Sequence, residues 1–301
     1  MTMDPSLLVL ASEAILSLYP ILIRTLPTTL MTQWLARFLV FPVLAYALSS
    51  AQEVPSLSTL LSRPSTLLSG LLNLVHIGAS YVSFSLLPAG TALSLFYTYP
   101  LFNVIAGWLF FNEQLSPMTF VLLAMAMAGV WLLARESTSS TNAHAPATTS
   151  EPLKGSPKTG VVAALLAALT ETLLYVFVRK TTISTASTPF RAILQLYPLG
   201  LLVLVAAIAI RPAEIDLTPA TLLTLFGFNA LVGFTGYATR FYTIPKVSTL
   251  TFSLLSFVGV VFGYVWGHLF TTDRTTPLSW LGSGLIVLTA FIARYQKDPR
   301  Q

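Results

Sequence analysis

Two carboxylates interrupt long apolar segments of this sequence, and they are the residues with the clearest chemical potential. Glu13 and Glu171 each lie inside such a segment, with no opposite charge one helical turn away. A carboxylate in apolar surroundings is suited to taking up and releasing a proton during a functional cycle. Alternatively, hydroxyl groups or an arginine from another segment satisfy each acid.

Two arginines provide possible binding sites for an anion. Arg37 lies two turns inside its apolar segment and could attract an anion or stabilise a gate. Alternatively, its aliphatic stem follows apolar surface and its guanidinium reaches water. Arg240, with Lys246 nearby, could attract a phosphorylated or carboxylated molecule, or it could mark the cytoplasmic end of its segment.

Further polar side chains fall at comparable depths of different segments. His76 could relay a proton or donate to a bound molecule, or it could be a packed hydrogen-bonding group. A helical rise of about 1.5 Å per residue places four amides in the middle or inner half of their segments. These amides are Asn73, Asn103, Gln195 and Asn229.

An aromatic run, "FYTYP" (96–100), places two phenols next to an amide and a proline. Tyr97 and Tyr99 lie near Asn103, and Pro100 frees a backbone carbonyl if this segment is helical. Aromatic faces with a few polar tips bind amphipathic metabolites or organic cations. Ordinary helix packing is the alternative. Tyr237 joins the candidate binding residues because its position matches another tyrosine, Tyr81, in the repeat described below.

No motif for catalysis or cofactor binding is present. The chain contains no cysteine, no metal-ligand spacing of His, Asp and Glu, no Ser-His-Asp order and no phosphate-binding glycine loop. We therefore predict a protein that is not an enzyme and that uses no metal or other cofactor.

The composition shows which environment must hold these polar groups. Of 301 residues, 54% are hydrophobic and only 9% charged, with a mean hydropathy of +0.76. Soluble domains carry roughly 25% charged residues, so this chain belongs in a lipid bilayer. The net charge of +5 comes from scattered basic residues beside apolar segments, which does not indicate nucleic-acid binding.

Ten segments are long and apolar enough to cross a bilayer as helices. We predict an all-α integral membrane protein with spans at 6–23, 30–49, 65–87, 90–111, 117–134, 159–178, 190–210, 219–239, 247–270 and 278–295. Residues 135–158 are rich in Ser, Thr, Ala and Pro and are predicted to form a flexible linker. The predicted units are therefore 1–134, the linker 135–158, and 159–301.

The distribution of basic residues predicts the orientation. Eight Lys and Arg residues lie in the loops on the side of the termini, and three on the other side, or six with the linker. Because cytoplasmic loops carry the excess of Lys and Arg, we expect both termini in the cytoplasm. The start lacks a basic signal-peptide region, so the first span should remain as a helix.

The two halves carry the same ordered set of residues. At an offset of 156 the pairs are Tyr19/Tyr175, Arg24/Lys180, Pro42/Pro198, Asn73/Asn229 and Tyr81/Tyr237; at 160 they are Thr91/Thr251, Phe102/Phe262, Gly107/Gly267, Glu113/Asp273 and Pro117/Pro277. Five spans per half is an odd number, so the halves must be inverted, as in secondary transporters. Glu113 and Asp273 would mark the N-terminal ends of the helices that follow them.

Several of these stretches also resemble a known family. They are "ARFLVFPVLAYAL" (36–48), the stretch 79–116 with Pro100 and Glu113, and Gly129. In these the chain resembles the drug/metabolite transporter superfamily, specifically EamA-type ten-helix exporters. Gln114 departs from the family's usual Glu-Arg-Leu. The resemblance implies a central cavity lined by the first, third, fourth, sixth, eighth and ninth helices, with the fifth and tenth peripheral.

We therefore predict a secondary active transporter that exports a small polar or amphipathic metabolite by alternating access, with protons as the candidate coupling ion. We expect it in the plasma or inner membrane, or alternatively in an organelle membrane, as a monomer or homodimer. Three alternatives remain: an anion exchanger of the triose-phosphate or nucleotide-sugar type, a membrane-embedded enzyme, and a receptor that transports nothing.

Overall fold

The computed structural model describes residues 3–26, 28–52, 54–87, 89–139, 156–185, 188–210, 215–270 and 276–295. These ranges are almost entirely helical and contain no strand. Within them, eight helices are long and apolar enough to cross a membrane, and two shorter apolar helices, Pro117–Leu133 and Trp280–Ala293, bring the total to ten. The predicted fold class is confirmed.

In its described residues the first half contains eight helices, of which α4 is a short connector. In chain order they are α1 (Pro5–Leu16), α2 (Tyr19–Thr25), α3 (Leu30–Leu48), α4 (Leu57–Ser62), α5 (Pro64–Leu86), α6 (Ala89–Phe96), α7 (Tyr99–Phe111) and α8 (Pro117–Ser139). Two pairs, α1 with α2 and α6 with α7, each make one broken span, so these helices form five spans.

The second half also forms five spans. Its elements are α9 (Pro157–Thr185), α10 (Pro189–Leu196), α11 (Pro198–Ile210), α12 (Pro219–Phe228), the π-helix η3 (Asn229–Phe234), α13 (Thr235–Thr243), α14 (Thr249–Ser256), α15 (Val258–Phe270) and α16 (Pro277–Tyr295). The three elements from α12 to α13 make a single span, as do α10 with α11 and α14 with α15.

Proline and hydroxyl residues define where many of these helices begin. Proline is the first residue of α1, α5, α9 and α16, among others, because its fixed φ suits a helix start and its missing N–H costs nothing there. The side chain of Thr29 accepts a hydrogen bond from Thr32 N, and that of Ser248 from Thr251 N. These bonds cap α3 and α14.

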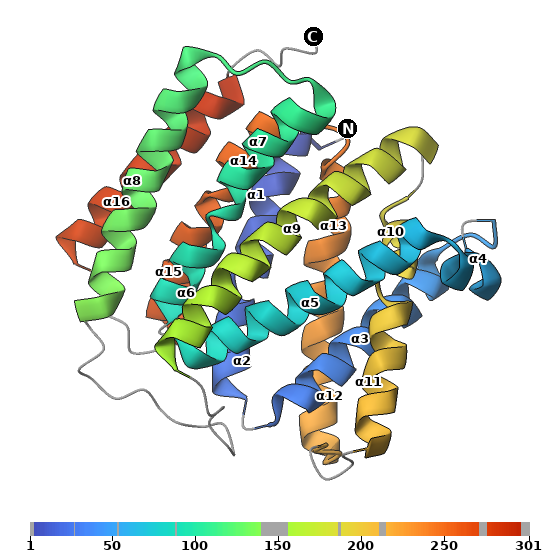
Figure 1. Ribbon diagram of the computed structural model, residues 1–301. Coiled ribbons are helices and arrows are strands. Elements are labelled where there is room, and N and C mark those ends of the chain that lie inside the picture. Colours follow the sequence, from blue (N-terminus) through green and yellow to red (C-terminus); the bar gives the residue numbers. More distant parts are fainter. Residues whose placement is uncertain are drawn as a thin grey trace.

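The two halves enter the bundle from opposite ends. Figure 1 shows α1 starting at the upper end of the view and α9 starting at the lower end. This inversion is the arrangement that an odd number of spans per half requires. Inverted repeats place their shared interface near the middle of the membrane, and charged residues of the two halves contact each other inside this bundle.

The fourth and ninth spans break at equivalent positions. The first break lies at Tyr97–Thr98 and the second at Phe257, 160 residues later. Pro100 accounts for the first break because it removes a helical hydrogen-bond donor. Val260 occupies the matching position after the second break, so a proline is not required there. Broken helices leave backbone groups available where they line a protein cavity.

Helices α8 and α16 pack against each other at one side of the bundle, away from α3, α11 and α12 (Figure 1). Two glycines allow this contact. A Cβ atom on Gly129 would lie 2.7 Å from the Gly282 carbonyl oxygen, and one on Gly282 would lie 2.8 Å from that of Gly129. The fifth and tenth helices therefore lie at the periphery, as the family resemblance implied.

Two predictions fall on residues that the structure does not describe or describes only in part. Of the linker 135–158, residues 140–155 lie outside the described ranges, while α8 continues through Ser139 and α9 starts at Pro157. The predicted counterpart of Glu113, Asp273, also lies outside them. The division into units at 134 and 159 stays a prediction.

Candidate functional site

The first buried ion pair joins the two halves. Glu13 on α1 and Arg240 on α13 are 0% and 3% exposed, and Glu13 Oε1 lies 3.1 Å from Arg240 Nη1. No neighbour on α1 could partner Glu13, so the alternative that an arginine from another segment satisfies it is the one observed. Arg240 is buried rather than placed at a membrane surface, which differs from its interpretation as an orientation charge.

Two tyrosines of the first half also donate hydrogen bonds to Glu13. The hydroxyl of Tyr97 donates to Glu13 Oε2 at 3.0 Å, and that of Tyr99 donates to Glu13 Oε1 at 3.3 Å. They flank the break between α6 and α7, which turns both phenols toward α1. The ring of Tyr99 also lies 5.0 Å from the Arg240 guanidinium, a cation–π distance.

A second acid contacts the same arginine. Arg240 Nη2 lies 2.8 Å from Glu171 Oε1 on α9, an ion pair whose angle is poor for a hydrogen bond. Arg240 therefore lies between two carboxylates, one from the first span of each half. The two acids are not at matched repeat positions, because the 156-residue offset would pair Glu13 with Leu169.

His76 on α5 connects Glu171 back to the first half. Its Nε2 lies 3.2 Å from Glu171 Oε2, and its Nδ1 lies 3.1 Å from the Ala167 carbonyl oxygen. A carbonyl only accepts, so Nδ1 must carry hydrogen. Nε2 and the carboxylate would then both be acceptors unless a proton lies between them. The contact between His76 and Glu171 is therefore an ion pair only when a proton lies between the two groups.

Arg37 on α3 is surrounded by aromatic rings instead of acids. Its guanidinium lies 4.8 Å from the ring centres of Tyr19 and Tyr237, 5.3 Å from that of Phe41 and 5.9 Å from that of Tyr81. Its Nε lies 3.5 Å from the Tyr197 hydroxyl. The side chain is 3% exposed, so it does not reach a membrane surface.

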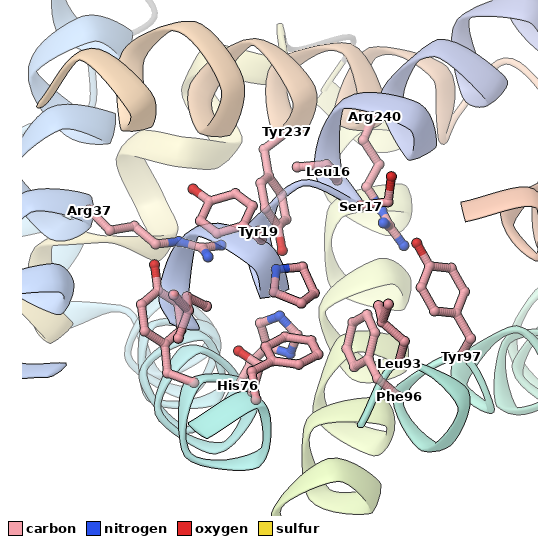
Figure 2. A pocket seen from close by; sticks show the side chains of 15 residues that line it. Leu16, Ser17, Tyr19, Arg37, His76, Leu93, Phe96, Tyr97, Tyr237 and Arg240 are labelled. Atoms are coloured by element: carbon pink, nitrogen blue, oxygen red, sulfur yellow. The ribbon is translucent and has the colours of Figure 1, made fainter. Parts of the chain in front are cut away.

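A cavity separates Arg37 from Arg240. Figure 2 shows the two arginines approaching it from opposite sides, with His76 on a third. Its apolar wall includes Leu93 and Phe96. The free volume is about 40 Å³, far below the roughly 300–1,000 Å³ of sites that hold small organic molecules. The halves must therefore move to admit one.

The structure brings most of the predicted site residues together. One cluster holds Glu13, His76, Tyr97, Tyr99, Glu171 and Arg240, and Arg37 and Tyr237 lie across the cavity from it. We call this set the cavity network.

The four predicted amides lie outside the cavity network. Asn73 Nδ2 donates to the Leu196 carbonyl at 3.2 Å, and Asn229 Oδ1 accepts from Tyr19 at 3.1 Å. Asn103 is fully buried, but neither it nor Gln195 contacts the cavity. The first two amides hold helices together, which is a structural role.

The sequence interpretation selected Tyr237 but not two other tyrosines around Arg37, Tyr19 and Tyr81. Tyr19 and Tyr81 face the arginine and line the cavity. Both belong to matched pairs of the repeat, Tyr19/Tyr175 and Tyr81/Tyr237. That pairing was the available signal, because tyrosine is costly in lipid unless its hydroxyl finds a partner.

A second charged cluster lies where α7 ends, and its centre is Glu113. Glu113 Oε1 accepts from Arg179 Nη2 at 2.9 Å, from Thr249 N at 3.0 Å and from Thr249 Oγ1 at 2.9 Å. Its Oε2 accepts from Leu250 N at 3.4 Å. We call Glu113, Arg179 and Thr249 the end cluster.

The end cluster corrects one expectation. Glu113 was predicted to mark the start of the helix that follows it, α8. Its carboxylate instead meets the first N–H groups of α14, in the other half of the chain. A helix N-terminus attracts negative charge, so the physical reason was right and the helix was wrong.

Comparisons with known proteins now identify the family. A family model described as "EamA-like transporter family" matches residues 5–135 and 158–295. The chain belongs to the EamA-like transporter family. It is thus an integral, multi-pass membrane protein of the drug/metabolite transporter type, as the resemblance implied.

Two individual similarities add to this. The chain is 32% identical over 63 residues to "Uncharacterized transporter sll1319" of Synechocystis sp. (strain ATCC 27184 / PCC 6803 / Kazusa). That match covers 21% of this chain and 19% of the relative. The fold is also similar to that of one crystal structure. The match covers 96% of this chain and 96% of that chain, with a TM-score of 0.73 and 16% sequence identity, and it supports the fold alone.

Proposed function

We propose that this protein is a secondary transporter that exports a small polar or amphipathic metabolite by alternating access, driven by proton exchange. One observation carries the proposal: two charged contacts of the cavity network cross between the halves. They are Glu13–Arg240 and His76–Glu171, at 3.1 and 3.2 Å. If the halves rock against each other, these contacts must change.

Protonation would weaken both contacts. A proton on Glu13 would remove its charge attraction to Arg240. A proton on Glu171 would remove its charge attraction to His76. Each change loosens one half from the other at the cavity, where a substrate would enter. Proton binding and the conformational change are therefore coupled through the same atoms.

The placement in the cell completes the proposal. We propose that both termini are cytoplasmic and that the plasma or inner membrane holds the protein, with an organelle membrane as the alternative. The basic residues in the loops support this orientation. The unit that works would be a monomer or a homodimer.

Counterflow uptake into proteoliposomes tests the proposal. We would use labelled amino acids, monocarboxylates, organic cations, sugar nucleotides and phosphate esters, with and without a pH gradient. We expect gradient-dependent uptake that is lost in Glu13→Gln and kept in Arg63→Gln, because Arg63 is exposed. Uptake of no compound by folded protein would contradict transport. Gradient-independent exchange confined to phosphate esters would favour the anion exchanger.

A further inference from the structure

Arg37 is a buried cation without a buried anion. Among the described residues it makes no ion pair: its polar partners are the hydroxyls of Tyr81, Tyr197 and Tyr237, and its Nη2 atom has no hydrogen bond of good geometry. The aromatic rings around it supply cation–π attraction, but a buried charge without a counter-ion still costs several kcal/mol. Such a residue is costly to retain unless something else neutralises it.

The two acids of the cavity network cannot neutralise Arg37. Glu13 pairs with Arg240 and accepts from two phenols. Glu171 contacts Arg240 and His76. Arg37 lines the cavity, and none of the described acids lies beside it. Its positive charge is therefore available to a ligand at the cavity wall.

We propose that the cavity binds a small monocarboxylate, with the carboxylate on Arg37 and a short apolar body against the wall of Leu93 and Phe96. This inference rests on the proposed function and names its substrate class. A guanidinium holds a carboxylate through directed, charge-assisted hydrogen bonds. The unpartnered Nη2 donor provides the first of these.

The charge of Arg37 and the lack of a free acid at the cavity indicate more closely which class of substrate the site binds. The single positive charge of Arg37 matches a monoanion, whereas a dianionic phosphate ester would carry a second charge that Arg37 cannot neutralise. A zwitterion such as an amino acid would need a free carboxylate for its ammonium group. No acid is among the described residues that line the cavity, and the two nearby acids, Glu13 and Glu171, already contact Arg240. The site therefore prefers a carboxylate without an ammonium group.

Equilibrium dialysis on purified protein in detergent, in buffer with a bulky anion in place of chloride, tests this class. The probes share one carbon skeleton: 4-methylpentanoate, its amide, leucine, 4-methylpentylamine and 4-methylpentyl phosphate. We expect 4-methylpentanoate to bind at least about tenfold more tightly than any other, the effect of one charge-assisted hydrogen bond. Equal or tighter binding of leucine, the amide or the phosphate, or binding of none, would overturn the proposal.

Variants at Arg37 connect the binding to this residue. We expect Arg37→Gln to weaken 4-methylpentanoate binding at least about tenfold, with Arg63→Gln unchanged. Unchanged binding in Arg37→Gln would overturn the assignment. If Arg37→Gln does not fold, Arg37→Lys keeps the charge but loses the fork of donors. It should bind several-fold more weakly with the same order of probes, and an altered order would contradict the proposal.

Dialysis separates this inference from the proposed function. Binding that follows the predicted order without any uptake in proteoliposomes would support the monocarboxylate site and contradict transport. Uptake of other compounds, without carboxylate binding, would support transport and contradict the monocarboxylate site.

Discussion

The cavity network and the end cluster both join the halves through an acid and an arginine, but their partners differ. In the end cluster, Glu113 accepts bonds from two backbone N–H groups at the start of α14. In the cavity network, Glu13 and Glu171 depend on side chains alone. Backbone donors at a helix start are fixed, whereas side chains can change partners. The first arrangement suits a permanent connection, and the second suits one that breaks and re-forms.

The difference is also visible in what surrounds each arginine. Arg179 donates to Tyr175, Thr249 and Glu113 and lies 4.6 Å from the ring centre of Phe111. Each of the two arginines has one nitrogen without a hydrogen-bond partner, Nε of Arg179 and Nη2 of Arg37, but Arg179 pairs with an acid, whereas Arg37 lines a cavity. Buried arginines are therefore informative only when their partners are known.

The largest expected effect breaks the centre of the cavity network. Arg240→Gln would leave Glu13 and Glu171 without their shared cation. Removing one member of a buried ion pair costs about 3–5 kcal/mol, so we expect a loss of that size in the free energy of unfolding. Uptake should be abolished. Thermal unfolding in detergent and proteoliposome uptake measure the two effects.

An exposed charge provides the control for Arg240. Arg63→Gln removes the same functional group from a surface position and should change stability by less than about 0.5 kcal/mol. A similarly small effect for Arg240→Gln would show that the two acids are neutral in the folded protein.

A smaller effect is expected at the end cluster. Glu113→Gln keeps the side-chain size but removes the charge that faces Arg179 and α14. We expect stability to fall by about 2–3 kcal/mol. Affinity for 4-methylpentanoate should stay within about twofold, because distant sites act independently. Loss of 4-methylpentanoate binding in this variant would show that the end cluster also affects the binding site, which contradicts the separate roles of the two clusters.

The backbone that aims Glu113 provides a third test. Asn112 has φ 53° and ψ 32°, and it is the one non-glycine residue with positive φ in the described part of the chain. This left-handed conformation costs a residue with a Cβ about 1–2 kcal/mol, less for Asn. We expect Asn112→Ala to lower stability by about 1 kcal/mol and Asn112→Gly to be tolerated. Thermal unfolding compares the two, and equal losses would contradict the conformational explanation.

The sequence predicted the spans well because length and hydropathy are local properties. It also selected Glu13, Glu171, His76 and Arg240 as candidates, because an ionisable group in a membrane span needs a partner, and the structure brings these four side chains together. It could not show which partner. Arg240 lies more than 200 residues from Glu13 in the chain, and only the packing of α13 against α1 joins them.

The amides and Arg179 also show that the position of a residue in the sequence does not reveal its partner. Asn73 and Asn229 were selected for their depth along their spans, but depth does not distinguish a helix contact from a cavity wall. Arg179 was counted only as a basic residue at the end of a span. Its role depends on Glu113, which is 66 residues away and meets it only because α7 and α9 pack together. A periodic pattern on one helix cannot encode such a pairing.

The smallest expected effect concerns Asp216, another carboxylate at a helix start, which unlike Glu113 faces water. It lies in the connection before α12, where Oδ1 accepts from Thr218 N and Oδ2 from the Thr221 hydroxyl, both at 3.0 Å. These bonds, the one from the backbone of Thr218 first, lower the pKa of Asp216 from its ordinary 3.8. A lowered pKa means that the folded state favours the charged form.

The stabilisation from Asp216 is therefore complete above the ordinary pKa and disappears as the pH falls through the lowered one. We expect Asp216→Asn to lower the unfolding temperature slightly at pH 7, and the difference from wild type to shrink below about pH 4. Thermal unfolding across pH 3 to 8 measures it. A difference as large as that of Glu113→Gln would mean that burial adds little to a carboxylate at a helix start. The contrast between the two clusters would then rest on the arginines alone.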